Sequence, residues 1–90
     1  MADRYWVGGS GTWNQTAHWS ETDGGVGGAS VPTVSDNVFF TSLSASANYT
    51  VTMVTGANCL DMNWANPSSG KPTMAGSNIA INIYGSLTFV

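Results

Sequence analysis

The chain has 90 residues, of which 42% are hydrophobic and only 8% are charged, and its net charge is −3. This length allows one domain with a modest core, and the lone Cys59 excludes an internal disulfide. Arg4 and Lys71 are the only cations, so the basic cluster that nucleic acids and anionic membranes require is missing. No apolar run approaches the roughly 20 residues of a membrane-spanning helix. Because the first residues include no apolar signal segment, we expect the protein to be made and kept, at least at first, in a cytoplasm.

The first 40 residues are rich in Trp and Gly. Trp6 and Trp13 flank Gly8-Gly9-Ser10-Gly11, where glycines adopt positive φ at little cost, which predicts a strand, a tight reversal and a second strand. Residues 14–20 suit one helical turn or a compact turn. Residues 21–30 form a polar, glycine-rich loop that ends in an extended segment at Val31-Pro32.

The remaining residues alternate between short apolar strands and turns. Asp36-Asn37 predicts a turn, and Val38–Phe40 predicts a strand buried on both faces. Clean alternation predicts half-buried strands at 49–54, 60–65 and 79–83, a turn at 56–58, an extended restart at Pro72 and a last strand from Leu87. An apolar strand that is still open at Val90 predicts either a continuing polypeptide or a covering subunit.

These elements predict one all-β domain over residues 1–90 with almost no helix. It divides into a Trp/Gly-rich base motif (1–40) and a ladder of short strands (41–90). The same alternating strands fit a small sandwich and a short β-solenoid, so the pattern leaves both architectures open.

Few side chains of the sequence are candidates for catalysis or metal binding. His18 and Cys59 are the only ones of their kind, and no motif pairs them as base and nucleophile; two such ligands also cannot complete a zinc site. Glu21 and Asp23 lie in a loop whose carboxylates and carbonyls are the ligands that calcium prefers, but the loop lacks the ligand density of an EF-hand, so we interpret it as a solvated loop. We therefore expect no enzyme, no catalytic residue, no metal and no cofactor.

The aromatic side chains are the most informative residues. In so small a domain they are expected to form the core or a subunit interface, and the residues concerned are Tyr5, Trp6, Trp13, Trp19, Phe39, Phe40 and Trp64. Exposed Trp and Tyr on a flat β face also stack on sugar rings, so a carbohydrate-binding module is the alternative hypothesis.

Residues 4–40 resemble the amino-terminal module of a family of tailed-phage virion proteins, which are head-fibre, decoration or tail-fibre proteins. The resemblance rests on Arg4-Tyr5-Trp6-Val7-Gly8-Gly9-Ser10-Gly11-Thr12-Trp13, on Val31-Pro32-Thr33 and on Asp36-Asn37-Val38-Phe39-Phe40. A looser similarity links the same pattern to β-strand repeats of bacterial autotransporters.

The resemblance implies a non-enzymatic base domain that attaches to a capsid or tail protein of the same virion and assembles in the host cytoplasm. It further implies a β-helical shaft after the last strand and a homo-oligomer, by analogy a trimer. Asp3 and Arg4 are expected near the docking surface. A glycan remains possible as a ligand of such an appendage.

Overall fold

The structure, a computed structural model, describes residues 2–41, 43–44, 48–53, 56–64, 72–76 and 81–89. Strands dominate these residues, which confirms the predicted all-β fold. The elements are β1 (Asp3–Trp6), β2 (Gly11–Thr12), the 3₁₀ turn η1 (Thr16–His18), β3 (Trp19–Ser20), β4 (Asn37–Phe40), β5 (Tyr49–Thr52), β6 (Ala57–Cys59), β7 (Met62–Trp64), β8 (Pro72–Ala75), β9 (Ile81–Ile83) and β10 (Leu87–Phe89).

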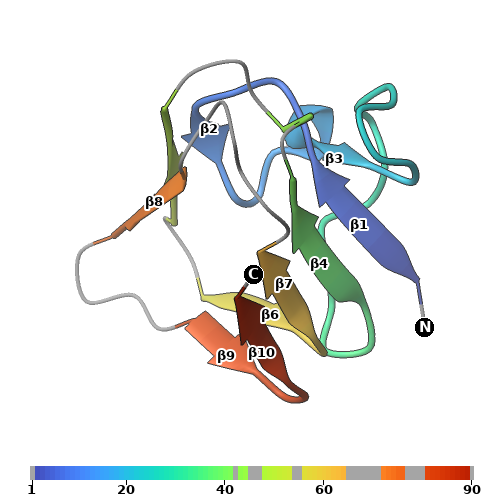
Figure 1. Cartoon of the computed structure of the whole chain (residues 1–90), viewed down its shortest axis with the longest axis vertical. Helices are drawn as coiled ribbons and strands as arrows, with labels where there is room; N and C mark the ends of the chain where they lie inside the picture. The colour runs from blue at the N-terminus through green and yellow to red at the C-terminus, as the bar shows by residue number, and fades with distance from the viewer. Residues whose placement is uncertain are drawn as a thin grey trace.

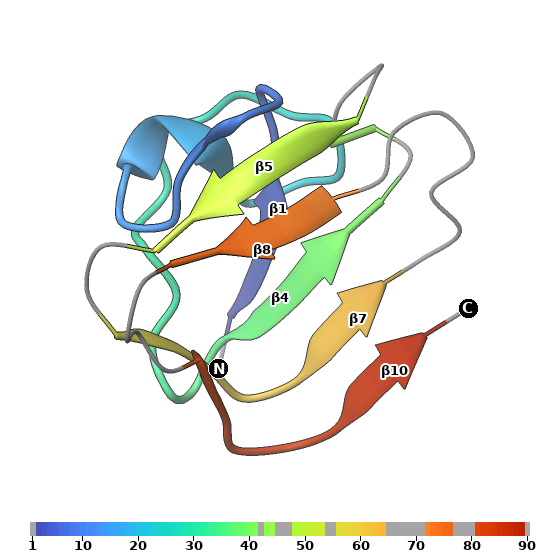
Figure 2. The same ribbon diagram turned by 90° about the vertical axis from the view of Figure 1, so that its left-hand side faces the viewer.

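The strands form three sheets that the chain visits in turn (Figure 1). The first sheet has the order β10-β7-β4-β1-β3, the second β2-β5-β8 and the third β6-β9. Every pair is parallel except β1 with β3. Because each circuit of the chain from β4 onward places one strand in each sheet, parallel to its neighbour, the architecture is a β-solenoid and not a sandwich. Figure 2 shows β1, β4, β7 and β10 following one another across the first sheet.

Alternation along each strand sends apolar side chains to the interior. On β5, Tyr49 and Val51 are buried, whereas Thr50 and Thr52 are partly exposed, as the sequence pattern predicts. Strands in parallel register then bring like positions into rows. One inward row runs from Trp6 through Phe40 to Trp64, whose rings follow one another across the sheet.

From β4 onward, successive strands of one sheet have nearly constant spacings that the sequence does not display: 24 residues from β4 to β7 and from β6 to β9, 25 from β7 to β10 and 23 from β5 to β8. Asn58 and Asn82 lie 24 residues apart and occupy the same position in successive strands of the third sheet. The amide nitrogen of Asn82 donates a hydrogen bond to the amide oxygen of Asn58 at 3.2 Å. This pair forms one rung of an amide ladder on the surface of the solenoid.

A tryptophan cap closes the amino-terminal end. Trp19 meets Trp6 and Trp13 edge to face, at centroid distances of 5.0 and 4.9 Å. The indole nitrogen of Trp19 donates to the carbonyl oxygen of Trp13 at 2.6 Å, and that of Trp6 donates to Gly9 O at 2.7 Å. With their polar atoms satisfied, these two indoles seal the core beneath β3.

Three expectations need correction. The glycines after Trp6 do not make a hairpin, because β1 and β2 belong to different sheets and the segment turns a corner of the solenoid. Residues 57–59 form β6 where a turn was predicted. Phe39 is not buried on an inner face, because only its neighbours Val38 and Phe40 point inward. Val90, on which the expectation of an open end rested, lies outside the described residues.

Candidate interaction surfaces

The tryptophans are structural side chains. Trp6, Trp13 and Trp19 are each at most 2% exposed, so none of them offers a ring face to a ligand. Trp64 is partly exposed and stacks on Phe40 with a centroid distance of 4.8 Å and an interplanar angle of 25°. Five of the seven predicted aromatics, the four tryptophans and Phe40, therefore form the inward row and the cap.

The other two predicted aromatics lie on the outer face. Tyr5 and Phe39 occupy the same position on β1 and β4, and their rings stack at 4.6 Å with an interplanar angle of 17°. Both are partly exposed. Partial burial, helped by the charges of Asp3 and Asp23, raises the pKa of the Tyr5 hydroxyl. This pair, the outer aromatic pair, is the only stacked pair of rings on the described surface of the first sheet.

Asp3 and Arg4 have different surroundings. Asp3 is exposed beside the outer aromatic pair and accepts a hydrogen bond from the Asn37 amide at 3.1 Å. Arg4 instead points into the fold's own loop, where its guanidinium donates to the carbonyl and hydroxyl oxygens of Ser30 at 2.8 Å. Asp3 thus remains available at the surface, whereas the Arg4 side chain ties the loop before β4 to β1.

Asp36 organises a turn, as its sequence context predicts. Its carboxylate accepts hydrogen bonds from the Thr33 amide at 2.9 Å, the Thr33 hydroxyl at 3.1 Å and the Ala2 amide at 3.2 Å. Burial alone would raise the pKa of this carboxyl, but these hydrogen bonds and the Arg4 charge outweigh burial and hold the pKa below its ordinary value.

Cys59 and His18 occupy separate elements. Cys59 is fully buried on β6, and burial, with a contribution from the Asp61 charge, raises its thiol pKa to about 11. His18 ends η1, where its ring stacks on Trp6 and its Nδ1 lies 2.7 Å from Val7 O. Cys59 is therefore a packed thiol and His18 a part of the tryptophan cap.

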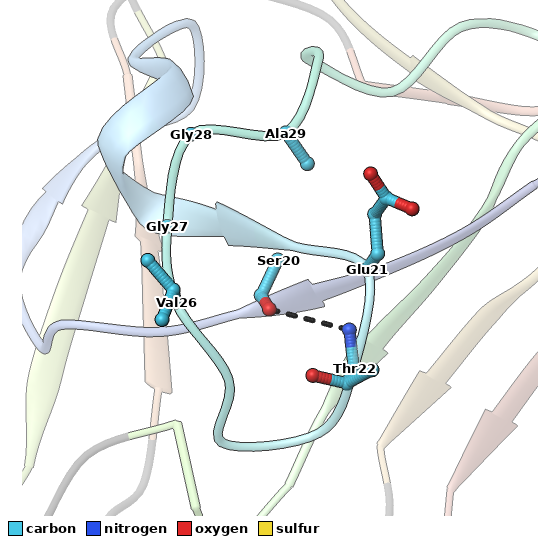
Figure 3. Close-up of a pocket in the computed structure, with 7 residues that line it drawn as sticks. All are labelled: Ser20, Glu21, Thr22, Val26, Gly27, Gly28 and Ala29. Atoms are coloured by element: carbon cyan, nitrogen blue, oxygen red, sulfur yellow. Dashed lines mark hydrogen bonds between the residues drawn. The ribbon is translucent and has the colours of Figure 1, made fainter.

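A shallow pocket lies in the loop after β3 and is lined by residues 20–22 and 26–29 (Figure 3). The amide of Thr22 donates to the Ser20 hydroxyl, which shapes the turn. Asp23 in the same loop accepts a hydrogen bond from the Thr41 hydroxyl. Within the described residues no group of three or more His, Cys, Asp and Glu side chains gathers in a way that could hold a metal ion.

The opposite end of the solenoid differs from the cap. We define the open end as the outer edges of β8, β9 and β10, the last strands of their sheets among the described residues. Leu87 is 48% exposed there, and Met74, Ile81 and Ile83 are partly exposed. Sequence alternation predicted these strands, but it could not show that they share one end of the molecule.

None of the helical structure in the described part of the chain is long and apolar enough to cross a membrane. Comparison with protein-family models, with curated proteins and with solved structures returned no match. The fold and its surfaces are therefore the basis for assigning a function.

Proposed function

We propose that the protein is a non-enzymatic virion structural protein of a tailed phage: a base domain of a head fibre, decoration or tail fibre. The observation that carries the proposal is where the resembling residues lie. The stretch from Arg4 to Trp13 supplies β1, β2 and two indoles of the cap, and residues 36–40 supply β4. The family-like sequence thus builds the cap together with the paired strands β1 and β4, one contiguous part of the fold, which suits a module at the base of an appendage.

Attachment to a capsid or tail protein is assigned to the outer face of β1 and β4. Tyr5 and Phe39 supply the aromatic rings of this face, because Trp6, Trp13 and Trp19 are internal. Asp3 and Asn37 border the two rings with polar groups. A small patch of this kind binds weakly on its own, and repeated copies on a particle add avidity. Assembly in the host cytoplasm and a location in the virion complete the proposal.

The test is incorporation into particles. Antibodies against the purified chain are applied to particles purified from a culture that expresses the gene, and labelling is read by electron microscopy. We expect label at regular positions on heads or tails. Protein that is abundant in the lysate and missing from purified particles contradicts the proposal.

A pair of variants assigns the attachment face. Tyr5→Ser with Phe39→Ser removes the outer aromatic pair. Val26→Ser instead removes a 90% exposed apolar side chain from the loop after β3. We expect the double variant to remain folded but to be lost from particles, and Val26→Ser to be incorporated normally. Equal incorporation of both variants rejects this face as the attachment surface.

A carbohydrate-binding module is the second candidate function. Asp3 and Asn37 lie beside the outer aromatic pair. A carbohydrate-binding site combines such rings, which stack on the sugar ring, with polar groups that bind its hydroxyls. However, the two rings lie over one another and do not extend side by side into a platform. Titration of the chain with the host's surface polysaccharide tests this candidate: saturable binding that the Phe39→Ala variant loses favours it, and no binding rejects it.

A further inference from the structure

We propose that the partner of the outer aromatic pair is a basic protein surface, from which an arginine side chain lies on the rings and pairs with the carboxylate of Asp3. The inference rests on the proposed function, because it names the chemistry that the attachment face of β1 and β4 recognises. It is argued from the acids around the rings, from the hydrogen bonds of Arg4 and from the geometry of the stack.

Two acids border the stacked rings of Tyr5 and Phe39, one at each end. Asp3 lies two residues before Tyr5 and therefore on the same face of β1. At the other end, Thr41 lies two residues after Phe39, and its hydroxyl donates a hydrogen bond to Asp23 of the loop after β3. Asp3 and Asp23 are both exposed. The rings of this face, which Figure 1 shows on neighbouring strands, therefore lie between two surface carboxylates.

Each of these carboxylates keeps capacity for a further donor. Oδ1 of Asp3 accepts a hydrogen bond from the Asn37 amide at 3.1 Å, and Oδ1 of Asp23 accepts one from the Thr41 hydroxyl. These hydrogen bonds use one oxygen of each acid, whereas an ionised carboxylate has about four acceptor positions. Asp3 can therefore accept the N–H groups of a guanidinium while it keeps Asn37.

The charges that act on Tyr5 are negative. Partial burial raises the pKa of its hydroxyl most, and the charges of Asp3 and Asp23 raise it further. The guanidinium of Arg4 is directed elsewhere, because its nitrogens donate to the carbonyl and hydroxyl oxygens of Ser30 at 2.8 Å and to the carbonyl oxygen of Asp3 at 3.0 Å. The face is therefore complementary to a positive charge that another molecule supplies.

The stack favours a guanidinium as that charge. The rings of Tyr5 and Phe39 lie 4.6 Å apart at 17° from parallel, so each ring covers one face of the other and leaves its opposite face for a third layer. A planar guanidinium stacks on an aromatic face while its N–H groups donate to a carboxylate. A lysine ammonium is a compact, strongly hydrated charge that does not stack as a plane. We therefore expect the partner to supply an arginine.

The experiment titrates the purified chain with the capped tripeptide Gly-Arg-Gly and follows the ring resonances of Tyr5 and Phe39 by NMR. Gly-Lys-Gly and Gly-citrulline-Gly are the matched probes, because citrulline keeps the shape of arginine without its charge. We expect saturable shifts of both rings with the arginine peptide. The lysine peptide should bind at least about twofold more weakly and the citrulline peptide at least about fivefold more weakly. Added salt should weaken binding of the arginine peptide.

Variants of the chain assign the contact to the acids. Asp3→Asn and Asp23→Asn each remove a charge but keep an oxygen that accepts the hydrogen bond from Asn37 or Thr41. Asp3→Asn should weaken binding of the arginine peptide about twofold to fivefold, and the double variant should weaken it at least about fivefold. Glu21→Gln is the matched control, because it removes the same charge from another exposed position of the loop after β3. Its affinity for the arginine peptide should be that of the wild type.

Thermal melts verify that the variants stay folded. Absence of binding, or equal binding of the arginine and citrulline peptides, overturns the inference, and so does an unchanged affinity in the double variant of Asp3 and Asp23. A lysine peptide that binds as tightly as the arginine peptide overturns the choice of a guanidinium. Particle labelling is read separately. Labelled particles without arginine binding reject this inference alone, whereas arginine binding without labelled particles rejects the proposed function and leaves the cation-binding face.

Discussion

The imidazole of His18 lies flat on the indole of Trp6, with ring centroids 4.7 Å apart and an interplanar angle of 7°. Its Nδ1 is 2.7 Å from Val7 O, so a stack and a hydrogen bond fix the ring together. The backbone of Gly11 lies against the imidazole, where an added Cβ would overlap Nε2, Cδ2 and Cε1 of His18. The imidazole of His18 therefore leaves no room for a side chain at position 11.

This contact predicts strong coupling between the two positions. We expect His18→Ala to lower the free energy of unfolding by about 1–2 kcal/mol through loss of the stack and the hydrogen bond. Gly11→Ala should cost about 1–3 kcal/mol because of the overlap. In the His18→Ala background the same glycine change should be neutral or stabilise by about 0.4–1 kcal/mol, since Gly11 does not need positive φ.

Urea denaturation of the four proteins measures the cycle. Gly9→Ala is the control, because Gly9 has φ +75° and no atom within 4 Å of an added Cβ. Its cost should come from the backbone alone and should be the same with or without His18. Additive effects of Gly11→Ala and His18→Ala would contradict the predicted overlap.

Asp36 predicts a loss of stability in acid. Its pKa is lowered in the folded state, so its contribution is complete above the unfolded pKa of about 3.9 and disappears as the pH falls through the folded pKa. Asp36→Asn should cost about 1–3 kcal/mol at neutral pH and should flatten the acid limb of stability against pH. Glu21→Gln, which removes an exposed carboxyl, should retain that limb; a wild-type-like limb in Asp36→Asn refutes the assignment.

Because of Cys59, we expect stability to fall as the pH rises in the alkaline range. Its thiol pKa is about 11 in the folded chain and about 8.5 when unfolded, so the unfolded state loses its proton first. Stability should fall between these values, and Cys59→Ala should remove that slope. Iodoacetamide at neutral pH should alkylate the native thiol about two orders of magnitude more slowly than the urea-unfolded one. Rapid alkylation of the native chain would show that the thiol is accessible.

We expect substitutions of Trp64 to change the stability of the fold and not the binding of a ligand. Trp64→Ala removes the ring that stacks on Phe40 and should lower the free energy of unfolding by about 2–4 kcal/mol. Trp64→Phe keeps a stacking ring and should cost less than about 1.5 kcal/mol. Denaturation curves for both variants measure this. Normal stability of Trp64→Ala combined with loss of polysaccharide binding would favour the carbohydrate-binding function instead.

The strands and their inward faces could be predicted from the sequence wherever one face is buried. The alternation around Val51 gave the correct face, because a half-buried sheet imposes a period of two on the sequence. Asp36 was identified as a turn residue for a similar reason: two of its three hydrogen bonds are local and come from Thr33, three residues away, whereas the bond from the Ala2 amide left no pattern in the sequence. Local chemistry of this kind leaves a pattern in the sequence.

The partners of each strand were not predictable, because stacking imposes only a weak pattern. Val38, Met62 and Leu87 form one row although no two of them are the same residue. An inward row needs only apolar side chains, so coil spacings of 23 to 25 residues leave no visible repeat. The glycines after Trp6 were ambiguous for another reason, since a corner between sheets and a hairpin use the same flexible residues.

The stacking of parallel coils also determines how local stability varies along the molecule. Apart from the antiparallel pairing of β1 with β3, every described strand pairs with one from a neighbouring coil, so each coil is stabilised by the coils beside it. The tryptophan cap holds closely packed rings and Leu87 on β10 is 48% exposed, so local opening should be rarest at the cap and most frequent at β10. Amide protons should accordingly exchange more slowly in β1 and β4 than in β10, which makes the cap the most persistent part of the described fold.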